Sequence, residues 1–192
     1  SPRFTLIEER AQFTSPHEIR IGNKLLKARS FIIATGSVIA NYSVPGLKET
    51  GFVTSDDILK MREAPDSIIV LGAGAVAVEL AQFLLRIGVK VTLLQRSEHI
   101  LSKGDEDLAK PVESRFREEG MDLYTGTKIL RAEKKPEGSV IYFEHEGKEK
   151  KVCARYILQA LGRRPNTDNL QLESAKIETQ KSCIPVDSKM KT

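Results

Sequence analysis

The chain has 192 residues, 40% hydrophobic and 29% charged, which suits a globular protein with one complete core or one core and part of another. Its formal charge is only +4, basic and acidic residues are interleaved, and 6% of residues are aromatic, which excludes a nucleic-acid surface. No apolar run is long enough to cross a bilayer and no secretion signal is present, so we expect a cytoplasmic protein without a membrane partner.

The first forty residues are predicted to form short strands and turns. Residues 4–8 and 11–14 have strand-like composition, and residues 18–21 alternate polar with apolar side chains before a Gly-Asn turn. Residues 31–36 form an apolar run that ends in glycine and is typical of a buried strand. We therefore expect a β-meander attached to one buried strand, followed by linker-like residues near position 44.

The next stretch predicts a β-α-β unit. Residues 67–71 are an apolar strand that ends in a glycine-rich turn, and apolar residues then recur at helical spacing. Gly88 closes this helix, and residues 90–95 form a second strand. The unit has the length of about thirty residues that such a crossover needs.

The turn has the pattern G-x-G-x-x-A, which is typical of dinucleotide-binding Rossmann units. Gly72 permits the tight exit from the strand, Gly74 lets a pyrophosphate approach the backbone, and Ala77 keeps the helix close to the sheet. The first N–H groups of the helix then face the phosphates. The binding candidates in this turn are Gly72, Gly74, Ala75 and Val76.

The end of the second strand favours NADPH, although NADH stays possible. An NAD site usually has Asp or Glu there to bind the ribose 2′-OH, whereas this chain has Gln95 followed by Arg96 and Ser97. A guanidinium can bind a 2′-phosphate through two parallel hydrogen bonds, Ser97 adds a neutral donor, and Lys103 is a further candidate. The competing interpretation is that Arg96 is only a solvated loop cation.

The remaining chain is predicted to continue the α/β pattern. A helix that runs to residue 119 precedes a third parallel strand near residues 121–124; acidic residues 105–107 favour a start there, whereas Pro111, which suits only a first turn, leaves the start open. Three antiparallel strands and another apolar strand follow, over residues 128–134, 139–145, 148–154 and 155–162. We expect a Rossmann-like parallel sheet with helices and an antiparallel meander. Cys153 and Cys183 lack metal or redox spacing; Cys153 is expected to be buried, and no metal site is predicted.

Four motifs in order extend this interpretation to a family. They are Ala34-Thr35-Gly36, Val44-Pro45-Gly46, the Gly72 turn continued to Glu79, and residues 160–167, which read A-L-G-R-R-P-N-T. Together they resemble the pyridine nucleotide–disulfide oxidoreductases, FAD enzymes that include glutathione reductase, dihydrolipoamide dehydrogenase and mercuric reductase. The Gln-Arg-Ser triplet at residues 95–97 is most similar to the mercuric reductase branch.

The resemblance implies a fragment centred on one domain. Residues 1–44 would be the last part of the first FAD-domain segment, residues 45–162 the NAD(P)H-binding domain, and residues 163–192 the start of the return to the FAD domain. Glu79 matches the acidic residue beside the nicotinamide, Gly162 a backbone position near the cofactor, and Arg163 a position facing the flavin domain.

The resemblance also implies that several functional motifs of the family lie outside these residues. The flavin-binding glycine motif, the redox cysteine pair and the acid–base pair are absent from these residues. We therefore expect no catalytic residue here, no FAD binding by this fragment alone, and partnership with the remainder of a homodimeric flavoenzyme. A non-catalytic nucleotide-sensing module and a partner-docking role for the meander are the alternatives.

Overall fold

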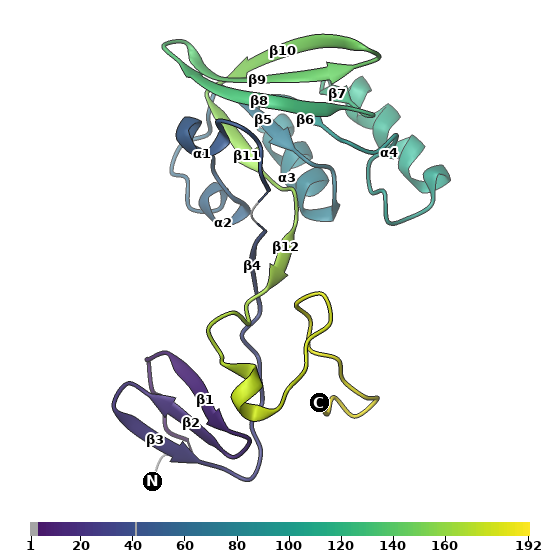
Figure 1. Cartoon of the computed structure of the whole chain (residues 1–192). Coiled ribbons are helices and arrows are strands. Elements are labelled where there is room, and N and C mark those ends of the chain that lie inside the picture. The colour runs from purple at the N-terminus through teal and green to yellow at the C-terminus, as the bar shows by residue number, and fades with distance from the viewer. Residues whose placement is uncertain (1–3, 41) are drawn as a thin grey trace. The chain divides into compact units, whose positions relative to one another are not determined.

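A computed structural model describes residues 4–40 and 42–192 (Figure 1). The chain divides into two compact units. One comprises Asn41–Gly162, and the other comprises Ser1–Ala40 together with Arg163–Thr192. In the described part of the chain, no helix has the length and apolar character needed to cross a membrane.

A four-stranded parallel sheet forms the centre of the Asn41–Gly162 unit. Its strand order is β11-β5-β6-β7, so the first strand of the β-α-β unit lies inside the sheet. Helix α3 joins β5 to β6, and helix α4 joins β6 to β7. The bounds are β5 Ser67–Leu71, α3 Ala75–Arg86, β6 Lys90–Leu94, α4 Glu106–Glu118, β7 Asp122–Tyr124 and β11 Tyr156–Gln159. This arrangement confirms the predicted α/β class with a parallel sheet.

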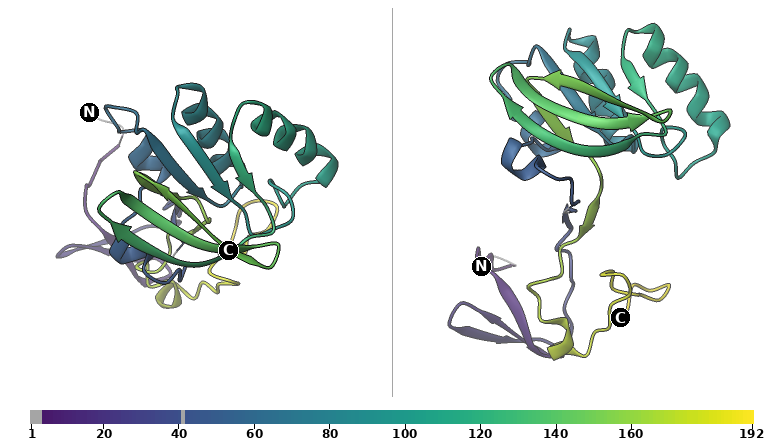
Figure 2. Two further views of the ribbon diagram at one scale, coloured as in Figure 1. Left: turned by 90° about the horizontal axis from the view of Figure 1, so that it is seen from above. Right: turned by 45° about the horizontal axis from the view of Figure 1, so that its top comes forward.

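An antiparallel sheet covers the face of the parallel sheet opposite to α3 and α4 (Figure 2). It consists of β8 (Lys128–Lys135), β9 (Gly138–His145) and β10 (Lys148–Ala154), with β9 in the middle. Successive side chains of β5 therefore pack into different layers. Ile68 and Val70 contact the helices, whereas Ile69 and Leu71 belong to the cluster shared with the antiparallel sheet.

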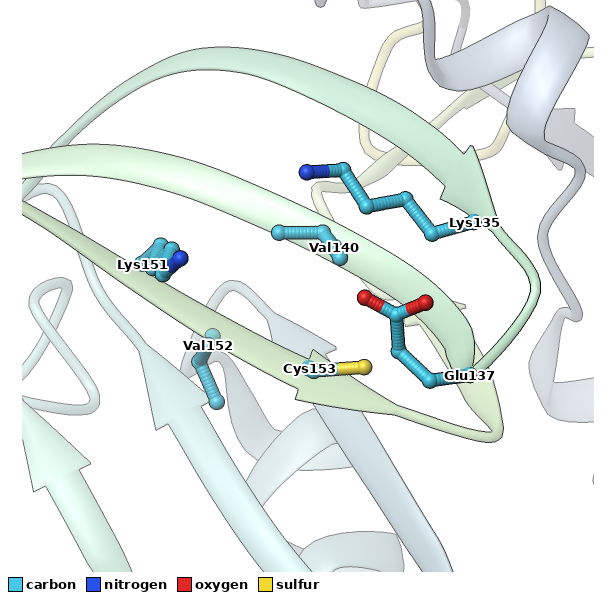
Figure 3. Close-up of a pocket in the computed structure, with 6 residues that line it drawn as sticks. All are labelled: Lys135, Glu137, Val140, Lys151, Val152 and Cys153. Carbon is cyan, nitrogen blue, oxygen red and sulfur yellow. The ribbon is translucent and has the colours of Figure 1, made fainter.

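The predicted burial of Cys153 is wrong. This thiol is exposed on β10, where alternate side chains face solvent. It lines a shallow hollow of about 220 Å³ over the antiparallel sheet, with Lys135, Glu137 and Lys151 among its neighbours (Figure 3). Strand-like composition identifies a strand, but which face of that strand is buried depends on what packs against it.

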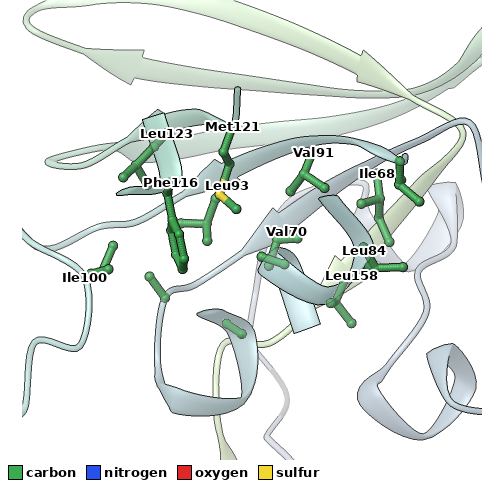
Figure 4. Packing of buried hydrophobic residues seen from close by; sticks show 14 of the residues in the cluster. Ile68, Val70, Leu84, Val91, Leu93, Ile100, Phe116, Met121, Leu123 and Leu158 are labelled. Atoms are coloured by element: carbon green, nitrogen blue, oxygen red, sulfur yellow. The ribbon is translucent and has the colours of Figure 1, made fainter. Parts of the chain in front are cut away.

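The helical side of the parallel sheet holds the larger core (Figure 4). Phe116 of α4 is 2% exposed and packs among the aliphatic side chains of β5, β6, β7 and α3. Ile100, from the loop after β6, is fully buried in the same cluster. Ile100 therefore anchors the loop between β6 and α4 in the core.

Two short helices precede β5. Helix α1 (Leu47–Thr50) buries Leu47 against the antiparallel sheet, and helix α2 (Ser55–Ile58) buries Ile58 in the larger core. Thr54 and Asp57 form a capping box at the start of α2, in which the Thr54 side chain accepts from the Asp57 N–H and Asp57 accepts from the Thr54 N–H.

Glu119 connects α3 to the end of α4. Its carboxylate accepts hydrogen bonds from Arg86 at 2.7 Å, from Gln82 at 3.1 Å and from Arg115 at 2.8 Å. The side chain of Glu119 is 12% exposed. The bond from Arg86, followed by the bond from Gln82, lowers the pKa of Glu119 to about 2.

The other unit is smaller. Strands β1 (Ala11–Ser15), β2 (Glu18–Ile21) and β3 (Lys24–Lys27) form the expected antiparallel meander. Strand β4 (Ser37–Ile39) pairs with β12 (Arg163–Pro165), so that Ile39 lies opposite Arg163. Phe13 packs with Leu172 and Ala175 of a 3₁₀ helix, Leu172–Ala175, in a core of its own.

Two strands predicted in the first forty residues are not formed. Residues 4–8 and 31–36 have no strand assignment, and Ile32 is 94% exposed. An apolar run becomes a strand when a neighbouring strand satisfies its backbone N–H and C=O groups. Within the described residues, no strand ladder includes either segment.

Candidate functional site

The turn after β5 requires glycine at its first position. Gly72 has φ 94°, a conformation that disfavours side chains, and its N–H donates to the carbonyl oxygen of Leu94 at 2.9 Å. A Cβ atom at Gly72 would lie 2.7 Å from the carbonyl oxygen of Ala160. The backbone is thus confined between β6 and the segment that follows β11.

The second glycine of the turn faces open space. Gly74 is the N-cap of α3, is exposed, and has extended backbone at φ −74° and ψ 176°. A Cβ atom there would meet nothing within 4 Å. The N-cap of α3 is a glycine and supplies no side-chain hydrogen bond, and within residues 4–40 and 42–192 no side chain is found bonded to the N–H groups of Ala75 and Val76 in the first turn. Ala77 is buried against the core.

The loop after β6 carries the predicted phosphate-binding side chains. Arg96 and Lys103 are exposed, and Ser97 is half-buried. Leu101 of this loop donates its N–H to the carbonyl oxygen of Ala73 at 2.8 Å. The structure therefore joins the loop directly to the glycine-rich turn, two segments that lie more than twenty residues apart in the sequence.

Gln95, at the end of β6, makes a contact that the sequence interpretation missed. Its side chain is turned inward, where Oε1 accepts from the Ala73 N–H at 3.2 Å and Nε2 donates to the His99 carbonyl oxygen at 3.4 Å. From the sequence alone, Gln95 is only a neutral replacement for a ribose-binding carboxylate. An amide at this position was the available signal, because an amide can donate and accept at once.

Hydrogen bonds join the glycine-rich turn to the loop after β6, and the exposed Arg96 and Lys103 of that loop, with the start of α3, suit a ligand that carries several phosphates. The sequence profile of the family described as pyridine nucleotide-disulphide oxidoreductase matches residues 1–192 of this chain, its whole length. The chain belongs to that family.

Proteins similar to this chain include enzymes named mercuric reductase and dihydrolipoyl dehydrogenase. The mercuric reductase of Staphylococcus aureus is 35% identical over 178 residues, which cover 93% of this chain and 32% of that protein. A dihydrolipoyl dehydrogenase of Thermus scotoductus is 34% identical over 192 residues, covering 95% of this chain and 40% of that protein. This chain therefore spans about a third of the mercuric reductase and two-fifths of the dehydrogenase.

A solved structure of a flavoprotein has a similar fold. The HOCl-induced flavoprotein disulfide reductase RclA of Escherichia coli superposes with a TM-score of 0.87 at 27% sequence identity. The superposition covers 97% of this chain and 42% of RclA. Fold similarity of this kind supports the family assignment across both units of the chain.

The two remaining predicted site residues occupy different environments. Glu79 lies exposed on α3, one helical turn after Ala75, and no hydrogen bond or ion pair is found for it within residues 4–40 and 42–192. Gly162 follows β11 with φ 135°, and a Cβ atom there would lie 3.4 Å from the Tyr42 hydroxyl. Their roles, like those of the other site residues, stay predictions.

Proposed function

We propose that residues 45–162 form the NAD(P)H-binding domain of a flavin-dependent disulfide oxidoreductase, with NADPH preferred. The observation that carries the proposal is the uncapped start of α3 beside the open Gly74, joined by the Leu101–Ala73 hydrogen bond to the loop that bears Arg96. This combination offers backbone donors for a pyrophosphate and a guanidinium for a further phosphate.

The chain's residues would hold the dinucleotide at three places. The N–H groups of Ala75 and Val76 would donate to the pyrophosphate, and the missing Cβ of Gly74 lets the phosphates approach. Arg96, assisted by Ser97 and Lys103, would bind the 2′-phosphate. Glu79 and the backbone at Gly162 would lie towards the nicotinamide.

NADPH, when bound, supplies a hydride from its C4 atom to a flavin. In the whole enzyme the electrons would pass from FAD to a disulfide, or to a metal or thiol acceptor, as the names of the relatives suggest. The residues described here would bind and orient the dinucleotide. We expect them to perform no disulfide chemistry, to bind no FAD alone, and to act with the remainder of a homodimeric flavoenzyme.

The preference for NADPH rests on charge. A carboxylate at the end of β6 would repel a 2′-phosphate, whereas Gln95 is neutral and Arg96 is exposed and cationic. Removal of a charge-assisted phosphate contact costs about 1.5–3 kcal/mol, or roughly ten- to a hundredfold in affinity.

Calorimetric titration of the purified chain with NADPH and with NADH tests the proposal. The wild-type chain is expected to bind NADPH more tightly, and Arg96→Ala is expected to reduce NADPH affinity to the NADH level. Arg62→Ala provides a matched control, because Arg62 is also exposed but lies outside this loop. Equal affinities in the wild type would overturn the NADPH preference, and no binding of either dinucleotide would overturn the proposed function.

A further inference from the structure

The side chain of Gln95 bridges two segments of the candidate site. The side-chain amide of Gln95 makes two hydrogen bonds. Together with the hydrogen bond from the Leu101 N–H, they connect Ala73 of the glycine-rich turn to the loop after β6. Both backbone polar groups of Ala73 are used in this bridge. The amide has only one suitable orientation, because Ala73 presents a donor to it and His99 presents an acceptor.

Gln95 is itself held rigidly. Its side chain is buried, with the residue 8% exposed, and its N–H donates to the Tyr124 carbonyl oxygen at 2.8 Å. Its carbonyl oxygen accepts from both the N–H and the hydroxyl of Thr127, each at 2.9 Å. The backbone of Gln95, from which the bridging side chain extends, is therefore held in place at the end of the parallel sheet.

The middle of the loop is held by further contacts. The Ile100 N–H donates to Oε1 of Glu113 on α4 at 2.9 Å, and the Ile100 side chain is fully buried. His99 Nδ1 lies 2.7 Å from the carbonyl oxygen of Ile100. The exposed Arg96 is thus part of a loop whose residues 99–101 are hydrogen-bonded to the turn and to α4.

We propose that Gln95 is a positioning residue for dinucleotide selectivity: its amide holds the loop against the turn, so that Arg96 meets the 2′-phosphate of a dinucleotide whose pyrophosphate binds at α3. This inference rests on the proposed function. Gln95 does not contact the ligand. Gln95 acts on binding by positioning Arg96. It therefore affects the affinity for NADPH, which carries the 2′-phosphate, more than the affinity for NADH, which lacks it.

The test is a double-mutant cycle on dinucleotide affinity, with Gln95→Leu, Arg96→Ala and the double variant titrated with NADPH and NADH. Gln95→Leu is expected to weaken NADPH binding about tenfold and NADH binding by much less, as suits the loss of a positioning hydrogen-bond bridge. In the Arg96→Ala background, the same substitution is expected to change NADPH affinity little, because the group it positions is gone.

Gln82→Leu is the matched control. It also removes an amide that joins two elements, since Gln82 donates to Glu119, but it lies away from the loop. It is expected to leave the ratio of NADPH to NADH affinity unchanged. A general loss of stability would affect both variants, whereas a change in the ratio distinguishes positioning from stability.

Gln95→Met keeps the approximate length of the side chain and loses both amide hydrogen bonds without adding a charge, so repulsion of the 2′-phosphate by a new carboxylate plays no part in its effect. It is expected to fold and to lose preference for NADPH. Selective NADPH binding by the wild type with an unchanged preference in both Gln95 variants would overturn the positioning role and leave the proposed function standing. No dinucleotide binding by the wild type would overturn the proposed function, and this inference with it.

Discussion

The carbonyl oxygen of Ala160 occupies the space that a side chain at Gly72 would need, with only 2.7 Å between it and an ideal Cβ position. Ala160 is held there because its own N–H donates to the carbonyl oxygen of Leu71 at 3.0 Å. The end of β11 and the exit of β5 therefore constrain each other. Gly74, two residues later, has no such neighbour, so the two glycines of one motif have different physical requirements.

Gly72→Ala is expected to destabilise the fold. Its φ of 94° is unfavourable for alanine, and the new methyl group would contact backbone that cannot rotate away. The free energy of unfolding should fall by roughly 2 kcal/mol or more. Urea denaturation followed by circular dichroism measures it, and an unchanged midpoint would contradict the described turn.

Gly74→Ala is expected to preserve stability and weaken dinucleotide binding. Its backbone conformation suits alanine and its Cβ position is open, so the midpoint of urea denaturation should match the wild type. The added methyl group would stand where the pyrophosphate approaches, and we expect roughly a tenfold rise in the Kd for NADPH. Calorimetric titration with full NADPH affinity in this variant would remove Gly74 from the site.

Glu119 is expected to make the folded chain less stable as the pH falls into the acidic range. Its folded-state pKa of about 2 lies below the ordinary value of 4.5, so its contribution is complete above about pH 4.5 and is lost as pH falls towards 2. Melting temperatures measured across this interval should fall more steeply for the wild type than for Glu119→Gln. Parallel curves would show that the bonds from Arg86 and Gln82 contribute no pH-dependent stability.

Phe116→Ala is expected to cost about 3–5 kcal/mol of unfolding free energy, because the side chain is enclosed by aliphatic neighbours and its removal leaves a cavity. Phe83→Ala is the control. Phe83 lies on α3 but is 53% exposed, so its removal should cost much less. Chemical denaturation of the two variants side by side tests this difference, and similar losses would contradict the described core.

The sequence was most informative where neighbouring residues in the chain determine the structure. The strand at residues 67–71, the glycine-rich turn and α3 follow from local periodicity and backbone requirements, and they form as predicted. The strand predicted over residues 31–36 is not formed, because apolar character alone supplies no pairing strand. The amide of Gln95 indicates a side chain that can donate and accept at once, but its partner Ala73 is 22 residues away, and only the fold identifies that partner.

The pairing of β4 with β12 has a consequence for how this protein can be rearranged. Ile39 lies opposite Arg163, so the chain leaves for the Asn41–Gly162 unit and returns from it at neighbouring points. A segment whose two ends are adjacent can be transplanted as a cassette, since a short linker is enough to rejoin the host chain after excision. The same geometry favours circular permutation of the excised unit, in which a short linker joins its two old ends and new termini are opened in one of its loops.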